Sequence, residues 1–155
     1  MIRLEMTSPA HLIPGDPPPA PLTLEEVTAA AAPQIRALYN RIWAPLGPSG
    51  RTAWTTAEWT AELSLPGIHT HLAVIDDEPA GFAELSAEPN GDVGIVVFGL
   101  LPEHQSKGFG SAFLTLTAQL AWTLNDPTTR VYLHTTPDEH PAALPNYESR
   151  GFRVV

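Results

Sequence analysis

Residues 105–110 read QSKGFG, and their types suit the binding of a phosphate group. Gly108 and Gly110 would let the backbone approach a ligand closely, and Lys107 adds a positive charge. A helix expected to begin here would offer unpaired N–H groups and a partial positive charge, which attract phosphate. A tight turn between a strand and a helix would also explain the two glycines. The third glycine of a dinucleotide site and the G-K-[ST] of a triphosphate site are both missing.

Histidines are the other residues that could do chemistry. His69 and His71 project from one face of an expected strand, and Asp138 lies close to His140 in the chain. A metal site needs three or four convergent ligands, and the sequence offers no such set. We therefore expect no metal.

Composition restricts the classes of function. The chain has 155 residues, 43% of them hydrophobic and 16% charged, which suits a single globular domain. The net charge of −9 disfavours nucleic-acid binding, and no apolar run reaches the ~20 residues that span a bilayer. Cysteine is absent and the N-terminus does not resemble a signal peptide, so we expect a cytoplasmic protein with no membrane partner. An acidic surface could attract a cationic amine, although solubility explains it equally well.

The N-terminal part differs in composition from the rest. Six of the 17 prolines lie between Pro9 and Pro21, which predicts a stiff, extended connector after a short strand at 2–6. We therefore divide the chain into residues 1–21, a strand and a Pro-rich connector, and residues 22–155, a single domain.

Periodicity predicts alternating strands and helices after the connector. We expect strands at 22–27, 69–76, 80–88, 93–101 and 130–136, helices at 31–43, 55–63, 109–124 and 140–152, and the start of a last strand at 152–155. Thr55 or Thr56 should cap the second helix with Glu58. The strand, helix and strand that end at residue 136 have the length of a right-handed crossover between parallel strands.

Two stretches together resemble the GCN5-related N-acetyltransferase (GNAT) family. The first, FGLLPEHQSKGFGSAFL, resembles motif A, whose pattern Q/R-x-x-G-x-G/A is met by Gln105, Gly108 and Gly110. The second, ALPNYESRGF, resembles motif B, with Tyr147 four residues before Gly151 and Phe152. The order of strands and helices also matches from about residue 22 to the end.

The resemblance implies a mixed α/β (α+β) fold. Its central sheet is mixed but mostly antiparallel, with a splayed parallel pair of strands and about four helices. It also implies acetyl-CoA as co-substrate, whose pantetheine arm would pair with the backbone of Gly99, Leu100 and Leu101. The diphosphate would rest on the loop formed by Gln105, Ser106, Lys107, Gly108, Phe109, Gly110 and Ser111. Gly99 is either a bulge that opens the sheet or a position of close packing.

The same resemblance suggests catalytic residues. Tyr147 matches the usual acid, which protonates the departing thiolate. The usual glutamate base aligns with Gly94, so we consider Glu84 and His134 as replacements, with Asp92 third and an ordered water as an alternative. His140 stands where motif B usually has an asparagine.

Three tryptophans mark the expected acceptor pocket. Trp43, Trp54 and Trp59 lie in the region that usually covers the acceptor, beside Glu58, Glu62 and Glu84. Such a site could hold a cation by charge and by cation–π contact, or the tryptophans could simply close the core.

We therefore expect an acyltransferase that moves acetyl from acetyl-CoA to a primary amine of a small molecule or peptide, by direct attack in a ternary complex. The absence of cysteine excludes a cysteinyl acyl-enzyme. The alternative is a catalytically silent acyl-CoA-binding sensor or interaction module. The chain stops where family members continue into a final strand. It is therefore truncated, or the 2–6 strand or a second subunit covers that edge, and an uncovered edge would favour a homodimer.

Overall fold

A computed structural model describes residues 1–155 except 48–49 and 138–139. Within this part of the chain, strands and α-helices occur in the following order: β1 Ile2–Met6, β2 Leu22–Val27, α1 Ala32–Trp43, α2 Thr56–Leu63, β3 Ile68–Ile75, β4 Glu78–Ala87, β5 Asp92–Leu100, α3 Phe109–Ala121, β6 Arg130–Thr135, α4 Ala143–Ser149 and β7 Arg153–Val154. Every expected strand and helix is therefore present.

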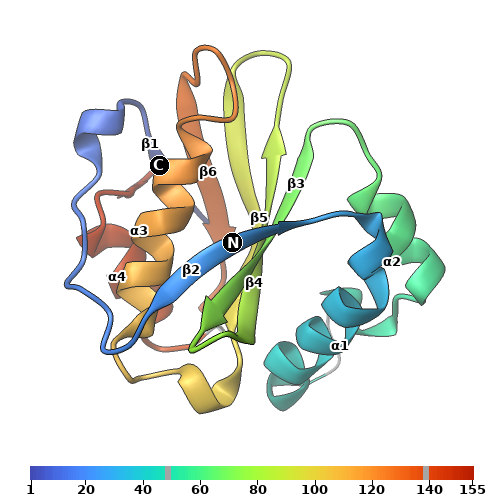
Figure 1. Cartoon of the computed structure of the whole chain (residues 1–155). Coiled ribbons are helices and arrows are strands. Elements are labelled where there is room, and N and C mark those ends of the chain that lie inside the picture. The colour runs from blue at the N-terminus through green and yellow to red at the C-terminus, as the bar shows by residue number, and fades with distance from the viewer. Residues whose placement is uncertain (48–49, 138–139) are drawn as a thin grey trace.

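The strands form one seven-stranded sheet in the order β2-β3-β4-β5-β6-β1-β7. All neighbouring pairs are antiparallel except β5 and β6, which are parallel and joined by α3. This arrangement confirms the expected mixed, mostly antiparallel sheet with one parallel pair. Figure 1 shows the sheet with α1 and α2 on one side and α3 and α4 on the other.

Alternation along the strands divides the core into two hydrophobic clusters. Leu72 and Phe82, which face each other across β3 and β4, pack with α1 and α2. Their neighbours Ala73 and Ala83 pack with α3 on the opposite face. Helix α3, which follows the loop at 105–110, and the two helices of the expected acceptor region are therefore held on opposite sides of one sheet.

Local sequence signals explain several boundaries. Thr55 and Glu58 form the predicted capping box at the start of α2, because each side chain accepts a hydrogen bond from the other residue's backbone N–H. Two helices are shorter than expected. Helix α3 ends at Ala121 and continues as a turn, and α4 begins at Ala143, because the His140 ring accepts a hydrogen bond from the Ala142 N–H in the preceding turn.

The described residues contain neither a membrane-spanning helix nor a cluster of metal-binding side chains. None of their helices is long and apolar enough to cross a membrane. Within the same ranges, no group of three or more His, Asp or Glu side chains is placed to hold a metal ion. Asp138, which is close to His140 in the chain, lies outside the described residues.

Candidate active site

The loop between β5 and α3 has the backbone geometry of an anion cradle. Ser106 and Gly108 both have left-handed backbone conformations, with φ of +60° and +92°. Helix α3 starts directly after Gly108, where no side chain caps its first N–H groups. The Gln105 side chain donates a hydrogen bond of 2.9 Å to the Leu100 carbonyl, which fixes the loop to the end of β5. Successive N–H groups in such a bend at a helix start can bind phosphate oxygens.

A cavity of about 440 Å³ opens beside this loop. Its wall includes the following expected coenzyme residues: Gly99, Leu100, Gln105, Ser106, Gly108, Gly110 and Ser111. Most of the remaining wall is apolar and comes from α1, the turn after it and α4. An elongated ligand with an anionic group at the loop and an uncharged arm along β5 fits this distribution.

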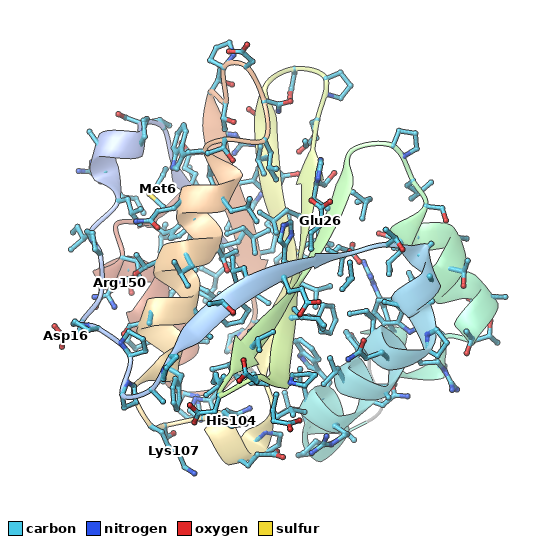
Figure 2. All side chains as sticks on the ribbon, in the orientation of Figure 1. Met6, Asp16, Glu26, His104, Lys107 and Arg150 are labelled. Atoms are coloured by element: carbon cyan, nitrogen blue, oxygen red, sulfur yellow. The ribbon has the colours of Figure 1, made fainter. Side chains whose placement is uncertain are left out.

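Three expected coenzyme residues do not line the cavity. Lys107 is exposed, and Figure 2 shows it at the outer edge of the molecule. Leu101 and Phe109 are buried in the two hydrophobic clusters, with 2% and 7% of their surfaces exposed. Their side chains therefore support the loop and the strand end from within the core.

The parallel pair separates as the sheet approaches this cavity. Strands β5 and β6 pair only from Asp92 to Ile95 and from Arg130 to Leu133, whereas β5 continues to Leu100. The last part of β5 therefore has no strand partner on its β6 side. This is the expected splayed parallel pair, and it leaves the backbone of β5 available to a ligand.

The bulge that distorts β5 is not at Gly99. The register between β4 and β5 shifts between Glu84 and Leu85, where Val97 and Ile95 are the partners and Val96 is the extra residue. At Gly99 a Cβ atom would lie 2.8 Å from the Trp43 ring. The bulge interpretation of Gly99 is therefore wrong, and the alternative of close packing is confirmed.

A second cavity of about 170 Å³ occupies the gap between the splayed strands. It is lined by Tyr39, Trp43, Ile95, Val96, Val97, Phe98, Leu133, His134 and Tyr147. Trp43, Phe98 and Tyr147 line both cavities, so the two spaces meet at these three side chains. Tyr147 is 5% exposed and its ring contacts Phe98 edge-on at 6.3 Å between centroids.

His134 lies in the wall of the second cavity. Its Nε2 accepts a hydrogen bond of 3.3 Å from the Arg3 Nε of the neighbouring strand β1. Because Nε2 is the acceptor in this contact, Nδ1 is the N–H group of the neutral ring and can donate to a second partner.

Glu84 is completely buried and lines neither cavity. Its carboxylate accepts two hydrogen bonds from the Arg51 guanidinium, at 2.8 and 3.0 Å, and Glu62 lies 3.4 Å from the same guanidinium. Burial and the nearby Glu62 raise the pKa of Glu84 to about 7, against the opposing effect of Arg51. Glu84 is thus held in an ion pair with Arg51 and lies outside the walls of both cavities.

Two of the three tryptophans pack against the arginine of this ion pair. The Arg51 guanidinium lies 4.4 Å from the Trp54 ring centroid and 5.0 Å from that of Trp59. Neither ring lines either of the two cavities described above, whereas Trp43 lines both. The cation that Trp54 and Trp59 contact is therefore the chain's own arginine.

Gly94 is covered by a side chain that sequence reasoning missed. A Cβ at Gly94 would lie 2.8 Å from the Tyr132 hydroxyl, because the two residues are paired across β5 and β6. The Tyr132 hydroxyl donates a 2.5 Å hydrogen bond to Glu88, and burial together with Glu88 raises the pKa of Tyr132 to about 12. Asp92, the third candidate base, is bound to Arg130 at 3.1 Å.

Helix α4 contributes a further residue that sequence reasoning missed. The Asn146 side chain donates a hydrogen bond of 3.2 Å to the Gly110 carbonyl, which joins α4 to the start of α3. Asn146 and His140 both line the first cavity. The sequence shows a polar residue directly before Tyr147, the expected acid. It does not show that Asn146 binds Gly110, which lies 36 positions away.

A family model described as "Acetyltransferase (GNAT) family" matches residues 33–152. The chain belongs to the GNAT family. This match covers both motif-like stretches, the splayed strands and both cavities.

Solved GNAT structures have the same fold. A GCN5-related N-acetyltransferase from Kribbella flavida matches 99% of this chain with a TM-score of 0.67 and 17% identity, and this chain covers 53% of that one. An acetyltransferase from Thermus thermophilus has a TM-score of 0.67 and 22% identity, with 86% of this chain and 88% of that chain covered.

An aminoglycoside N-acetyltransferase in complex with CoA has a TM-score of 0.63 and 17% identity, with 89% of this chain and 91% of that chain covered. The chain thus spans about half the length of the Kribbella protein and most of the other two. No curated protein matches this sequence significantly.

Acetyl-CoA is the co-substrate that membership of the GNAT acetyltransferase family implies for this chain. The residues present fit this molecule. The left-handed bend at Ser106 and Gly108 offers backbone amides to the diphosphate, and the free side of β5 offers backbone groups to the amide-containing arm.

Proposed function

We propose that the protein is an N-acetyltransferase that moves acetyl from acetyl-CoA to a primary amine of a small molecule or peptide, by direct attack in a ternary complex. The meeting of the two cavities at Trp43, Phe98 and Tyr147 is the observation that carries the proposal. One space lies beside the anion-binding loop and the other lies between the splayed strands. A donor and an acceptor could therefore reach one point from different sides.

The chain's residues have distinct tasks in this proposal. When bound, acetyl-CoA supplies an acetyl group activated as a thioester. Gln105, Ser106, Gly108, Gly110 and Ser111 hold the diphosphate through the loop, and Gly99 and Leu100 lie along the arm. Leu101 and Phe109 support the same segment from the core, and the exposed Lys107 lies outside the cavity wall.

Tyr147 provides the proton for the departing sulfur. A phenol and an alkyl thiol release protons in a similar pH range, so the transfer costs little driving force. The hydroxyl belongs to a side chain in the wall of both cavities, so it can reach the point where the thioester and the amine meet.

His134 is the base that we favour, because it is the candidate that borders the second cavity. In the neutral ring Nε2 is the nitrogen with a lone pair, so it would accept the proton that the amine loses, directly or through an ordered water, once the Arg3 Nε–H moved away from it. Glu84 faces Arg51, and Asp92 faces Arg130, so each carboxylate would first have to leave an ion pair.

The acceptor would enter the second cavity beside Trp43. An acidic chain with net charge −9 favours a cationic amine over an anionic one. Trp54 and Trp59 could contribute a cation–π contact only if Arg51 moved away. Two structural relatives are named as aminoglycoside acetyltransferases, which makes aminoglycosides a sensible class to include in tests. We further propose a cytoplasmic location.

The test is thiol release from acetyl-CoA with a panel of polyamines, amino acids, aminoglycosides and peptide N-termini. Acetylation of one class, identified by mass spectrometry, supports the enzyme. Calorimetric binding of acetyl-CoA without consumption of any acceptor would instead identify the catalytically silent acyl-CoA-binding module. Absence of binding to either acetyl-CoA or CoA would reject both.

A further inference from the structure

The Pro-rich segment at 7–21, which we name the N-terminal strap, packs against the coenzyme side of the molecule. It connects β1 to β2 and lies outside residues 33–152, which the family model matches. Figure 1 shows it running along the outside of α4 and α3 before it enters β2. The strap therefore adds to this chain something that the family match does not include.

The strap is bound to the end of α4 by reciprocal hydrogen bonds. The Ile13 N–H donates to the Arg150 carbonyl, and the Arg150 Nε donates to the Ile13 carbonyl, both at 2.9 Å. Gly151 has a left-handed conformation, and a Cβ there would lie 1.9 Å from the His11 carbonyl oxygen. Only glycine fits this contact, so the strap and the chain after α4 form one tightly packed unit.

The strap also contacts the first turns of α3. The Gly15 N–H donates a hydrogen bond of 2.9 Å to the Thr115 hydroxyl. A Cβ at Gly15 would lie 2.8 Å from the Ser111 Cβ and 2.8 Å from the Arg150 Nη1. Gly15 therefore sits in the angle between α3 and α4, and its lack of a side chain lets both approach.

A continuous path leads from the strap to the loop. The Arg150 Nη1 donates to the Asn146 Oδ1 at 3.4 Å, and the Asn146 Nδ2 donates to the Gly110 carbonyl at 3.2 Å. Asn146, Gly110 and Ser111 line the first cavity, whereas Arg150 and Gly15 do not. Figure 2 shows Arg150 beside the strap, above Lys107 in the view.

We infer that the strap is a brace that sets the position of the loop amides for the coenzyme diphosphate, with Arg150 and Gly15 as positioning residues. This inference rests on the proposed function. Phosphate binding by backbone N–H groups depends on their mutual geometry, and a displacement of an ångström is costly. Because α3 and α4 each hold part of the cavity, a brace that touches both fixes the space between them.

The first variant is Arg150→Ala, with Arg153→Ala as the matched control. Arg153 is an exposed arginine in β7 that lies three residues further along the chain. We expect Arg150→Ala to weaken CoA binding roughly tenfold in calorimetry, whereas the control stays within about twofold of wild type. Arg150→Lys should recover only part of the affinity, because an ammonium lacks the planar fork that serves Ile13 and Asn146 together.

The decisive measurement separates the brace from a general loss of structure. S-acetylpantetheine carries the same thioester but no diphosphate. Arg150→Ala should lower kcat/KM roughly tenfold with acetyl-CoA and leave it nearly unchanged with S-acetylpantetheine. Equal losses with both donors would mean a merely structural role and would overturn the inference.

Gly15→Ala is the second variant, used also if Arg150→Ala does not fold. Its methyl group would push on Ser111 and Arg150, so CoA affinity should fall, and the melting temperature should drop only as far as leaves the protein folded in the binding assay. If both variants fold and bind CoA as tightly as wild type does, the brace is rejected and the proposed function is not affected. Failure of the wild-type protein to bind CoA rejects the proposed function itself.

Discussion

Tyr147 is the residue for which activity is the most direct readout, because its side chain borders both cavities. Tyr147→Phe keeps the ring and its contact with Phe98 but removes the hydroxyl. We expect kcat to fall by roughly 10²-fold or more, which is the usual contribution of a general acid. Thiol release measures the loss, and calorimetry with CoA is the control, since coenzyme affinity should stay near wild type. An unchanged kcat would mean that another group or water protonates the sulfur.

Glu84 illustrates how a buried carboxylate can make stability depend on pH. Burial and Glu62 raise its pKa from an ordinary 4.5 to about 7, so the folded state binds this proton more tightly than the unfolded state does. The resulting stabilisation is complete below about pH 4.5 and is lost as the pH rises through 7. The folded protein should therefore gain stability from this group as the pH falls from 8 to 5.

The variant Glu84→Gln tests this pH dependence. Its free energy of unfolding should lack the gain, which we expect to be on the order of 1 to 3 kcal/mol. Urea unfolding at pH 5 and pH 8 of both proteins gives the comparison. Parallel pH profiles for wild type and variant would show that Glu84 keeps its ordinary pKa in the fold.

At the scale of elements, the pairing of β5 with β6 determines what the site can contain. The strands meet over four residue pairs and then separate, and Tyr132 covers Gly94 where they still meet. A carboxylate at position 94 therefore has no room while Tyr132 is in place. The unusual glycine and the tyrosine opposite it are two parts of one packing arrangement.

Gly94→Ala tests this arrangement through stability. The added methyl would lie 2.8 Å from the Tyr132 ring, so we expect a loss of about 1–3 kcal/mol in the free energy of unfolding. In a Tyr132→Ala background the same change should cost much less, because the clash is gone. Urea denaturation of the four proteins gives the double-mutant cycle. Purely additive effects would contradict the proposed contact.

At the scale of the whole molecule, the first strand completes the sheet at its far end. Strand β1 lies between β6 and β7, and its Leu4 is completely buried opposite Leu133 and Val154. Of the three explanations for the uncovered edge, coverage by the 2–6 strand is the one seen at β6. Residues 1–21 and 22–155 share one sheet as a result.

Leu4→Ala tests whether the whole molecule unfolds as a unit. Loss of a fully buried leucine should cost about 2–5 kcal/mol. Because β1 is flanked by strands from the C-terminal part, we expect one cooperative transition at lower temperature. Calorimetry and circular dichroism should give the same midpoint. A separate early transition, with the remainder melting as before, would show that β1 folds independently.

Association is the other property of the whole molecule that remains a proposal. The sheet ends in β2 on one side and the short β7 on the other, and Val154 in β7 is 53% exposed. An exposed apolar edge favours pairing with a second copy. We therefore expect the sedimentation coefficient to rise with concentration, as a monomer–dimer equilibrium requires. Val154→Lys should shift the equilibrium to the monomer, and a concentration-independent monomer would exclude the homodimer.

The sequence by itself determined those features that depend on residues close together in the chain. The glycines at the start of α3, the capping box of Thr55 and Glu58, and the alternation along the strands all follow from local backbone and side-chain preferences. Hence the order of elements, the coenzyme loop and the GNAT resemblance could be predicted from the residues alone.

Only the tertiary structure decided which distant residues meet. Arg51 forms an ion pair with Glu84, 33 positions further along the chain. The Tyr132 side chain fills the space above Gly94, 38 positions away, and Gly15 of the strap contacts Ser111, 96 positions away. No periodicity in the sequence encodes such pairs, because they depend on how the strands twist and where the connections run. The bulge belongs at Val96 for the same reason, since a register shift is a property of two strands and cannot be read from one.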